Sequence, residues 1–94
     1  AFLAGQGAER ARPHIDRGRD LRGRGEHDAA VAAFSDAVRA YPGSAEAYLE
    51  RGLTRRQAGD PKGAVDDYTE AIRLKPGWAL AYANRAGSLA ALGE

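Results

Sequence analysis

Apolar residues recur along the chain at the spacing of a helix. After Asp60-Pro61 they follow one another at intervals of three and four residues, as Ala64, Val65, Tyr68, Ala71 and Ile72. An aspartate accepts hydrogen bonds from the free amides at the start of a helix, and proline fits the first helical position, where its missing N–H is no loss. Because proline cannot continue a helix, we predict a helix with one apolar face that begins near Pro61 and ends before Pro76.

The same pattern occurs earlier in the chain, where Ala30, Val31, Phe34, Ala37, Val38 and Tyr41 precede Pro42. Pro42 and Pro76 are 34 residues apart, and this shift is called one repeat period below. Aligning residues 11–44 with residues 45–78 gives 11 identities in 34 positions, against roughly a tenth expected by chance for this composition. A third copy begins at residue 79 and is in mid-repeat at residue 94. Each copy has two apolar segments separated by a short polar turn, so we predict paired helices and no strands.

Small residues fall at matching positions of the two full copies. Gly18 with Ala30, and Gly52 with Ala64, are predicted to lie where the helices of each pair cross, because small side chains allow the backbones to approach closely. Bulky Phe34 and Tyr68 follow beside them, and Tyr48 and Tyr82 are predicted to face the preceding pair. Because Gly18, Gly23 and Gly25 weaken a helix interior, we expect the first helix to be the least stable.

Taken together, these landmarks resemble the tetratricopeptide repeat family over residues 11–94. The resemblance implies an all-α fold, an alpha-alpha superhelix in which antiparallel helix hairpins stack as a right-handed solenoid of about two and a half repeats and five helices. The first repeat then spans 11–44, the second spans 45–78, and the first helix of the third spans 79–94. The segment 1–10 is predicted to be a linker or the end of a preceding helix.

Five positions depart from the family pattern. His14 stands where the family favours a large aromatic residue. Arginine occupies three positions that commonly hold leucine, and a fourth that is often tyrosine; these are Arg17, Arg51, Arg85 and Arg55.

The family resemblance implies a non-catalytic protein-interaction module, with a partner peptide or helix in the concave groove lined by the first helix of each repeat. The groove positions are then Arg12, Ile15, Asp16, Arg19, Arg22, Leu49, Glu50, Leu53, Arg56, Ala83 and Asn84. Aliphatic side chains offer apolar contact, and arginines are expected to hold an acidic side chain or a C-terminal carboxylate. The competing interpretation, that each is an ordinary surface residue, stays open.

Family members that hold the acidic tails of chaperones use a clamp of Lys, Asn, Asn, Lys and Arg. The matching positions of this chain are Ile15, Arg19, Glu50, Leu80 and Asn84. We predict that the clamp is absent, since a glutamate at its centre repels carboxylates.

Charge is balanced overall, at +1, but six arginines lie between Arg10 and Arg24. Arginine binds phosphate and carboxylate well, which favours an acidic ligand. The alternative is a solvated helix face with local ion pairs, such as Asp16 with Arg19 and Asp20 with Arg24. We favour the ion pairs and do not expect nucleic acid as a partner, because this segment lacks the stacking aromatics of nucleic-acid sites.

Catalytic signatures are missing from the sequence. There is no cysteine, and His14 and His27 lack the spacing of a helical zinc site. We interpret His14 as a packing residue and His27 as an exposed turn residue, and we expect no enzyme activity, cofactor, metal or small-molecule substrate. No stretch approaches the roughly 20 apolar residues of a membrane span. The composition is that of a soluble protein, and the compartment stays open.

A different class of function is self-assembly. Trp78, Leu89 and Leu92 belong to a helix without a hairpin partner in this sequence, so we expect an exposed apolar stripe. This alternative predicts a homo-oligomer formed through the third-repeat helix.

Overall fold

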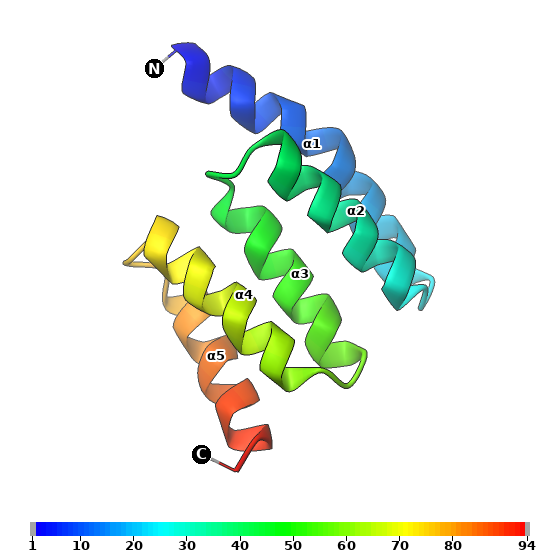
Figure 1. Ribbon diagram of the computed structural model, residues 1–94, viewed down its shortest axis with the longest axis vertical. Coiled ribbons are helices and arrows are strands. Elements are labelled where there is room, and N and C mark those ends of the chain that lie inside the picture. The colour runs from blue at the N-terminus through cyan, green and yellow to red at the C-terminus, as the bar shows by residue number, and fades with distance from the viewer. Residues whose placement is uncertain (1, 94) are drawn as a thin grey trace.

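The computed structural model describes the backbone of residues 2–93 and, within them, is built from five helices and no strand (Figure 1). They are α1 (Phe2–Gly23), α2 (His27–Ala40), α3 (Ala45–Gln57), α4 (Pro61–Leu74) and α5 (Ala79–Ala91). The predicted all-α class is confirmed. No helix in the described residues has the length and apolar character to cross a membrane.

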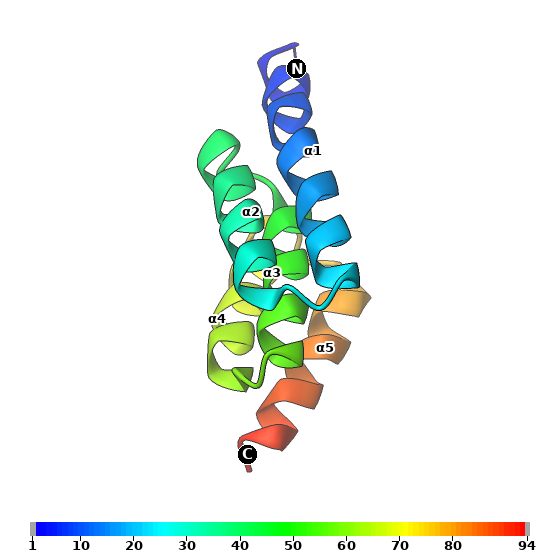
Figure 2. The same cartoon turned by 90° about the vertical axis from the view of Figure 1, so that its right-hand side faces the viewer.

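Neighbouring helices pack as antiparallel hairpins, α1 with α2 and α3 with α4, and α5 packs on α4. In the second view α2 and α4 lie on one side of the molecule and α1 and α5 on the other, with α3 between them (Figure 2). The molecule is a flattened stack of 43 × 30 × 16 Å. The first helix of each repeat therefore contributes to a common face.

Polar side chains and glycines define the helix ends. Asp60 accepts a hydrogen bond from the Gly63 amide at 2.9 Å, and Pro61 takes the first position of α4, as predicted. Each first helix ends before a glycine with positive φ, at 77°, 87° and 83°; these are Gly25, Gly59 and Gly93, each one repeat period after the last. Glycine adopts this conformation without steric cost, so each turn follows at the same point of its repeat.

The helices of each hairpin touch at a glycine, as predicted. A Cβ atom at Gly18 would lie 2.4 Å from the Phe34 ring, and one at Gly52 would lie 2.6 Å from the Tyr68 ring. The aromatic ring, more than the neighbouring alanine, therefore requires glycine at the crossing.

Two apolar cores follow one another along the stack. The first contains Ile15, Phe34 and Ala47, and the second contains Leu49, Tyr68 and Ala81 among others. Each core includes an alanine from the first helix of the following repeat. Burial of apolar area thus joins each hairpin to the next one.

Two sequence expectations need correction. The segment 2–10, expected as a linker or the end of a preceding helix, continues α1 without a break, with Pro13 inside the helix; Ala1 lies outside the described residues. Gly7 packs there against Tyr41, where a Cβ atom would lie 2.6 Å from the ring. His27 is not a turn residue: it is half-buried and begins α2, because Gly25 already completes the turn.

Arginines in the positions that commonly hold leucine connect successive repeats. Arg51 donates to the Ser35 hydroxyl at 3.1 Å, and Arg85 donates to the Thr69 hydroxyl at 3.3 Å, in both cases 16 residues back. Each guanidinium also lies over the tyrosine three residues before it, at 5.4 and 5.5 Å from the ring centre.

Candidate binding groove

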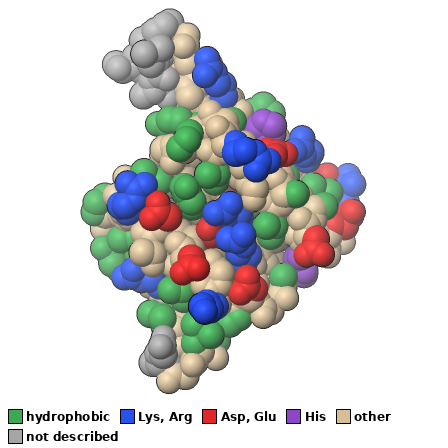
Figure 3. Space-filling model, in the orientation of Figure 1, with side chains coloured by type: hydrophobic (Ala, Val, Ile, Leu, Met, Phe, Trp, Pro, Cys, Tyr) green, Lys and Arg blue, Asp and Glu red, His purple; other side chains and the backbone are tan. Residues whose placement is uncertain are grey.

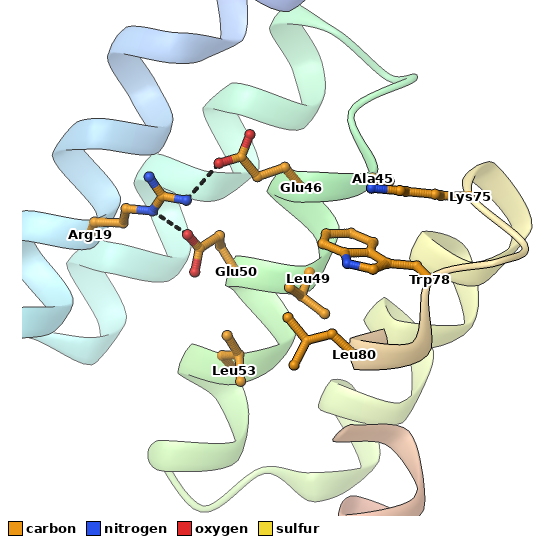
Figure 4. Close-up of a pocket in the computed structure, with 9 residues that line it drawn as sticks. All are labelled: Arg19, Ala45, Glu46, Leu49, Glu50, Leu53, Lys75, Trp78 and Leu80. Carbon is orange, nitrogen blue, oxygen red and sulfur yellow. Dashed lines mark hydrogen bonds and ion pairs between the residues drawn. The ribbon is translucent and has the colours of Figure 1, made fainter. Parts of the chain in front are cut away.

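A pocket of about 370 Å³ opens between α3 and the start of α5. Its lining comes from α1, from α3, from the turn that leads into α5 and from the first turn of α5, and consists of Arg19, Ala45, Glu46, Leu49, Glu50, Leu53, Lys75, Trp78 and Leu80 (Figure 4). Apolar side chains of α3 and α5 face one another across the pocket, while the charged residues from α1 and α3 lie at one edge.

The apolar part of the pocket is accessible to a ligand. Leu49 belongs to the second core, whereas Leu53 and Trp78 are half-buried and pack against that core. Leu80 leaves 51% of its surface exposed, and the Lys75 ammonium lies 4.4 Å from the centre of a Trp78 ring. An exposed leucine beside a half-buried tryptophan is a surface that favours an apolar side chain of a partner.

The charged edge is a continuous set of ion pairs between α1 and α3, which we call the charge ladder: Arg12, Glu46, Arg19, Glu50 and Arg22. Glu46 accepts from Arg12 and from Arg19, each at 2.6 Å. Glu50, only 5% exposed, accepts from Arg19 and, at 2.9 Å, from Arg22. The guanidinium groups of this part of the groove are thus already bound to carboxylates of the same chain.

The charge ladder also shifts the pKa values of its members. Burial by itself raises the pKa of Glu46, but hydrogen bonds and charges from Arg12 and Arg19 outweigh it, so the net pKa is lowered. The hydrogen bond with Glu46 raises the pKa of Arg12, and the hydrogen bond with Glu50 raises the pKa of Arg19. All three groups are therefore held in their charged forms.

Four of the groove positions named from the sequence line the pocket: Arg19, Leu49, Glu50 and Leu53. Arg12 and Arg22 lie beside it in the charge ladder. Exposed Asp16 contacts Arg12 at 3.6 Å. Outside the pocket lining, Arg56 and Ala83 are exposed and Asn84 is half-buried.

The expectation for Ile15 is wrong. Its side chain is 1% exposed and packs in the first core with Phe34 and Ala47, so it offers no contact to a ligand. The expectation that Arg19 and Arg22 are available to an acidic ligand is also wrong, because Glu50 occupies both.

Five pocket residues were not among the groove positions: Ala45, Glu46, Lys75, Trp78 and Leu80. Two features of the sequence indicate that some of these residues belong to the groove. Glu46 and Glu50 are four residues apart and so share a helix face, and Trp78 lies one repeat period after Ser44. Ser44 caps α3 by accepting from the Ala47 amide at 3.1 Å, whereas Trp78 begins α5 without a side-chain cap.

Five of the six arginines in the basic run of α1 pair with carboxylates. Arg24 pairs with Asp20 at 2.8 Å, as predicted, while Asp16 pairs with Arg12 instead of Arg19. Arg17 reaches Asp36 of α2 at 3.0 Å. Basic and acidic side chains lie next to one another over the face shown in Figure 3, with no separate basic patch.

The stripe expected to drive self-assembly is only partly exposed. Leu92 is 40% exposed, but Trp78 lines the pocket and Leu89 is half-buried. The apolar surface of α5 is therefore divided between the pocket and the end of the helix.

Two hairpins and a fifth helix, joined by equivalent contacts one repeat period apart and presenting a groove on their first helices, define a helical-repeat protein. A family model described as the tetratricopeptide repeat matches residues 15–79. The chain belongs to the tetratricopeptide repeat family.

Solved structures share this fold at low sequence identity. The second such domain of Spaghetti (RPAP3), bound to the HSP90 peptide SRMEEVD, is 24% identical with a TM-score of 0.89, covering 97% of this chain and 84% of that one. MamA is 26% identical with a TM-score of 0.86, over 88% of this chain and 48% of that one. The TPR2AB domain of yeast Sti1, in complex with pHSP90, is 22% identical with a TM-score of 0.86, over 97% of this chain and 36% of that one. No curated protein matches the chain.

Proposed function

We propose that the chain is a non-catalytic protein-interaction module that binds a segment of a partner protein through the pocket between α3 and α5. The partner segment presents a bulky apolar side chain, which enters beside Trp78 and Leu80. The observation that carries this proposal is the pocket itself: about 370 Å³, with Leu80 half exposed in its wall. Such an anchor side chain gains free energy by leaving water.

The residue at position 78 supports this function. In the preceding repeat the same position holds Ser44, which stabilises the start of α3 as a cap. Capping residues contribute about 1 kcal/mol, and α5 begins without this contribution because tryptophan stands there. Proteins give up local stabilising contacts, such as a helix cap, mainly at functional sites. The tryptophan at this position therefore favours a role in binding.

The structural neighbours add support from the fold. The RPAP3 domain holds an HSP90 peptide and the Sti1 domain is in complex with pHSP90, so stacked hairpins of this shape can present a groove to an extended chain. In the present chain, ion pairs occupy the α1 side of the groove, which leaves the α3–α5 side for the partner.

A pair of leucine substitutions tests the pocket. Peptides are first selected on the folded protein from a displayed library, and binding is then titrated by the fluorescence of Trp78, the only tryptophan. We expect Leu80→Asp to weaken binding about tenfold or more, because a carboxylate replaces part of the apolar wall.

Leu92→Asp is the matched control, since Leu92 is a similarly exposed leucine at the other end of α5. It should change affinity less than about twofold, because surface changes away from a site have small effects. Equal effects of the two substitutions, or no effect of Leu80→Asp, would show that partners do not use this pocket.

A further inference from the structure

The internal repeat allows two parts of the groove to be compared position by position. We call the contact between α1 and α3 the first junction, and the contact between α3 and α5 the second. Moving the first junction by one repeat period carries Arg22 onto Arg56, and carries its acidic partner Glu50 onto Asn84. The second junction thus has the arginine of the first junction without the carboxylate.

In the first junction Arg22 is fully occupied. Its guanidinium donates to the Glu50 carboxylate at 2.9 Å and lies within 3.5 Å of the Thr54 hydroxyl. It also stacks over the Phe34 ring, 5.7 Å from the ring centre. This arrangement shows which contacts an arginine at that position makes when a carboxylate is present.

In the second junction Arg56 is exposed, and its side chain forms no hydrogen bond or ion pair with any residue of the described part of the chain. Its guanidinium nevertheless lies near α5 and near Tyr68. A Cβ atom at Gly87 of α5 would lie 3.5 Å from the Arg56 guanidinium. Burial raises the pKa of Tyr68, which replaces Phe34, and the charge of Arg56 is the strongest opposing influence.

Two further polar groups near Arg56, the hydroxyls of Ser88 and Tyr68, have no partner among the described residues other than each other, and that contact is imperfect. In the first junction the Thr54 hydroxyl donates to the Glu50 carbonyl oxygen at 2.8 Å. Its counterpart Ser88 and the neighbouring Tyr68 are both fully buried, and neither hydroxyl has a hydrogen-bond partner of acceptable geometry among the described residues. Buried polar groups are normally paired, so the second junction is polar but incomplete.

We propose that a carboxylate of the partner completes the second junction by binding Arg56, in the place that Glu50 fills beside Arg22. This inference rests on the proposed function and specifies its ligand: a segment with one bulky apolar side chain in the pocket and an acidic group close to it. The carboxylate is a side chain of aspartate or glutamate, or the C-terminus of the partner.

The spacing of the two groups follows from the helix. Leu53 lines the pocket and Arg56 lies three residues further along α3, so their side chains are neighbours roughly 5–6 Å apart at Cβ. An extended chain advances about 3.3 Å per residue. The acidic group therefore lies about two or three residues from the apolar anchor.

The test is a library selection with a fixed central leucine and random flanking positions, performed on the wild-type protein and on three variants. Arg56→Gln removes the cation. Asn84→Glu supplies the carboxylate that Glu50 provides in the first junction and so competes with the ligand. Lys62→Gln, an exposed cation on α4, is the control for lost charge.

We expect aspartate and glutamate to be enriched about fivefold two or three residues from the leucine on the wild-type protein and on Lys62→Gln, and not on the other two variants. Peptides with the central leucine should be recovered above a matched library with a central serine in all four selections. Such recovery without acidic enrichment overturns the inference and leaves the proposed function standing, whereas the loss of both overturns both.

A second measurement covers the case in which a variant fails to fold. An enriched peptide and its Glu-to-Gln analogue are titrated against the wild-type protein and Arg56→Gln, which changes an exposed side chain and should retain the helical circular dichroism. The acidic peptide should bind the wild type about tenfold tighter than its analogue, and this ratio should fall to about one in Arg56→Gln. An unchanged ratio overturns the assignment of Arg56.

Discussion

Tyr68 and Phe34 occupy the same position of successive repeats and differ by one hydroxyl group. Both rings are fully buried against a glycine of the facing helix. The Tyr68 hydroxyl makes no hydrogen bond of normal geometry with the described residues, although the Ser88 hydroxyl lies near enough to act as an imperfect partner. A buried hydroxyl that has lost water without gaining a partner destabilises the folded state.

Removing that hydroxyl should therefore be harmless. We expect Tyr68→Phe to leave the free energy of unfolding unchanged or to raise it by about 1 kcal/mol, measured by urea denaturation. The reciprocal change, Phe34→Tyr, should lower it by about 1–3 kcal/mol. A loss of more than about 1 kcal/mol in Tyr68→Phe would mean that the hydroxyl has a partner in solution.

Glu46 should make stability depend on pH in acid. Because its folded pKa is below the ordinary value of 4.5, its contribution is fully present above about pH 4.5 and is lost as the pH falls through the lower folded value. Glu46→Gln should lower the free energy of unfolding at pH 7 by about 0.5–1 kcal/mol, the range of partly exposed ion pairs.

The difference between wild type and Glu46→Gln should narrow as the pH falls below 4.5 and close once the pH is below the lowered folded pKa, where both carry a neutral side chain. Thermal denaturation across this range measures it. Glu70→Gln serves as the comparison, because among the described residues Glu70 pairs only with the exposed Arg73 of its own helix. A gap that does not narrow as the pH falls below 4.5 would show that the ion pairs with Arg12 and Arg19 are not its source.

Among the helices, α3 and α4 are joined by a buried carboxylate that the first hairpin lacks. Asp67, 2% exposed, accepts from Arg51 at 2.8 Å and from Arg55 at 2.9 Å. The equivalent positions of the first repeat are apolar: Ala33 for Asp67 and Leu21 for Arg55. The two hairpins thus use different chemistry for one contact.

Breaking this contact on one side should be costly, and changing both sides should restore it. We expect Asp67→Ala to lower the free energy of unfolding by about 2–3 kcal/mol, because it leaves two half-buried guanidinium groups without a carboxylate. Asp67→Ala combined with Arg55→Leu reproduces the side chains of the first repeat and should recover most of the loss, as measured in a double-mutant cycle.

Glu70→Ala, at an exposed pair, should cost less than about 0.5 kcal/mol in the same assay. If the double variant were no more stable than Asp67→Ala, the apolar solution of the first repeat would not be transferable to the second.

The helices themselves could be predicted because their signals are local. Asp60, Pro61 and the glycine that follows each first helix act over a short stretch of the chain, and the repeat period reproduces several of them. The start of α1 could not be predicted in this way. Pro13 signals a helix start, but the segment before it packs Gly7 against Tyr41, which is distant in the sequence.

In the whole molecule, each helix packs mainly against the helices that lie next to it along the stack. Helix α3 contacts all four other helices, whereas α5 contacts only α4 and α3. In a linear stack the stability of an element follows the number of its neighbours. The middle of the stack should be held more firmly than its end.

Amide hydrogen exchange measures this gradient. We expect the protected amides of α3 to exchange at least about tenfold more slowly than those of α5, because opening α3 disrupts both cores. Equal protection in the two helices would contradict a stack that is stabilised only by nearest neighbours and would favour one cooperative unit.

The groove was only partly predictable, since its contacts join residues that are far apart in the sequence. The sequence shows that Arg19, Arg22 and Glu50 share the groove side, but side-chain reach decides that Glu50 occupies both arginines. The expectation for Ile15 was wrong for the same reason: its family position indicates a surface, but its side chain packs in the first core with residues of α2 and α3.

The contact of Arg51 with Ser35 and of Arg85 with Thr69 has a consequence for how such a chain can grow. A duplicate of the segment 45–78 inserted after Trp78 would present its arginine to Thr69, just as Arg85 does now, and would offer the same hydroxyl to whatever follows. Internal duplication of this segment in a gene would thus yield a longer array whose new joint needs no compensating mutation.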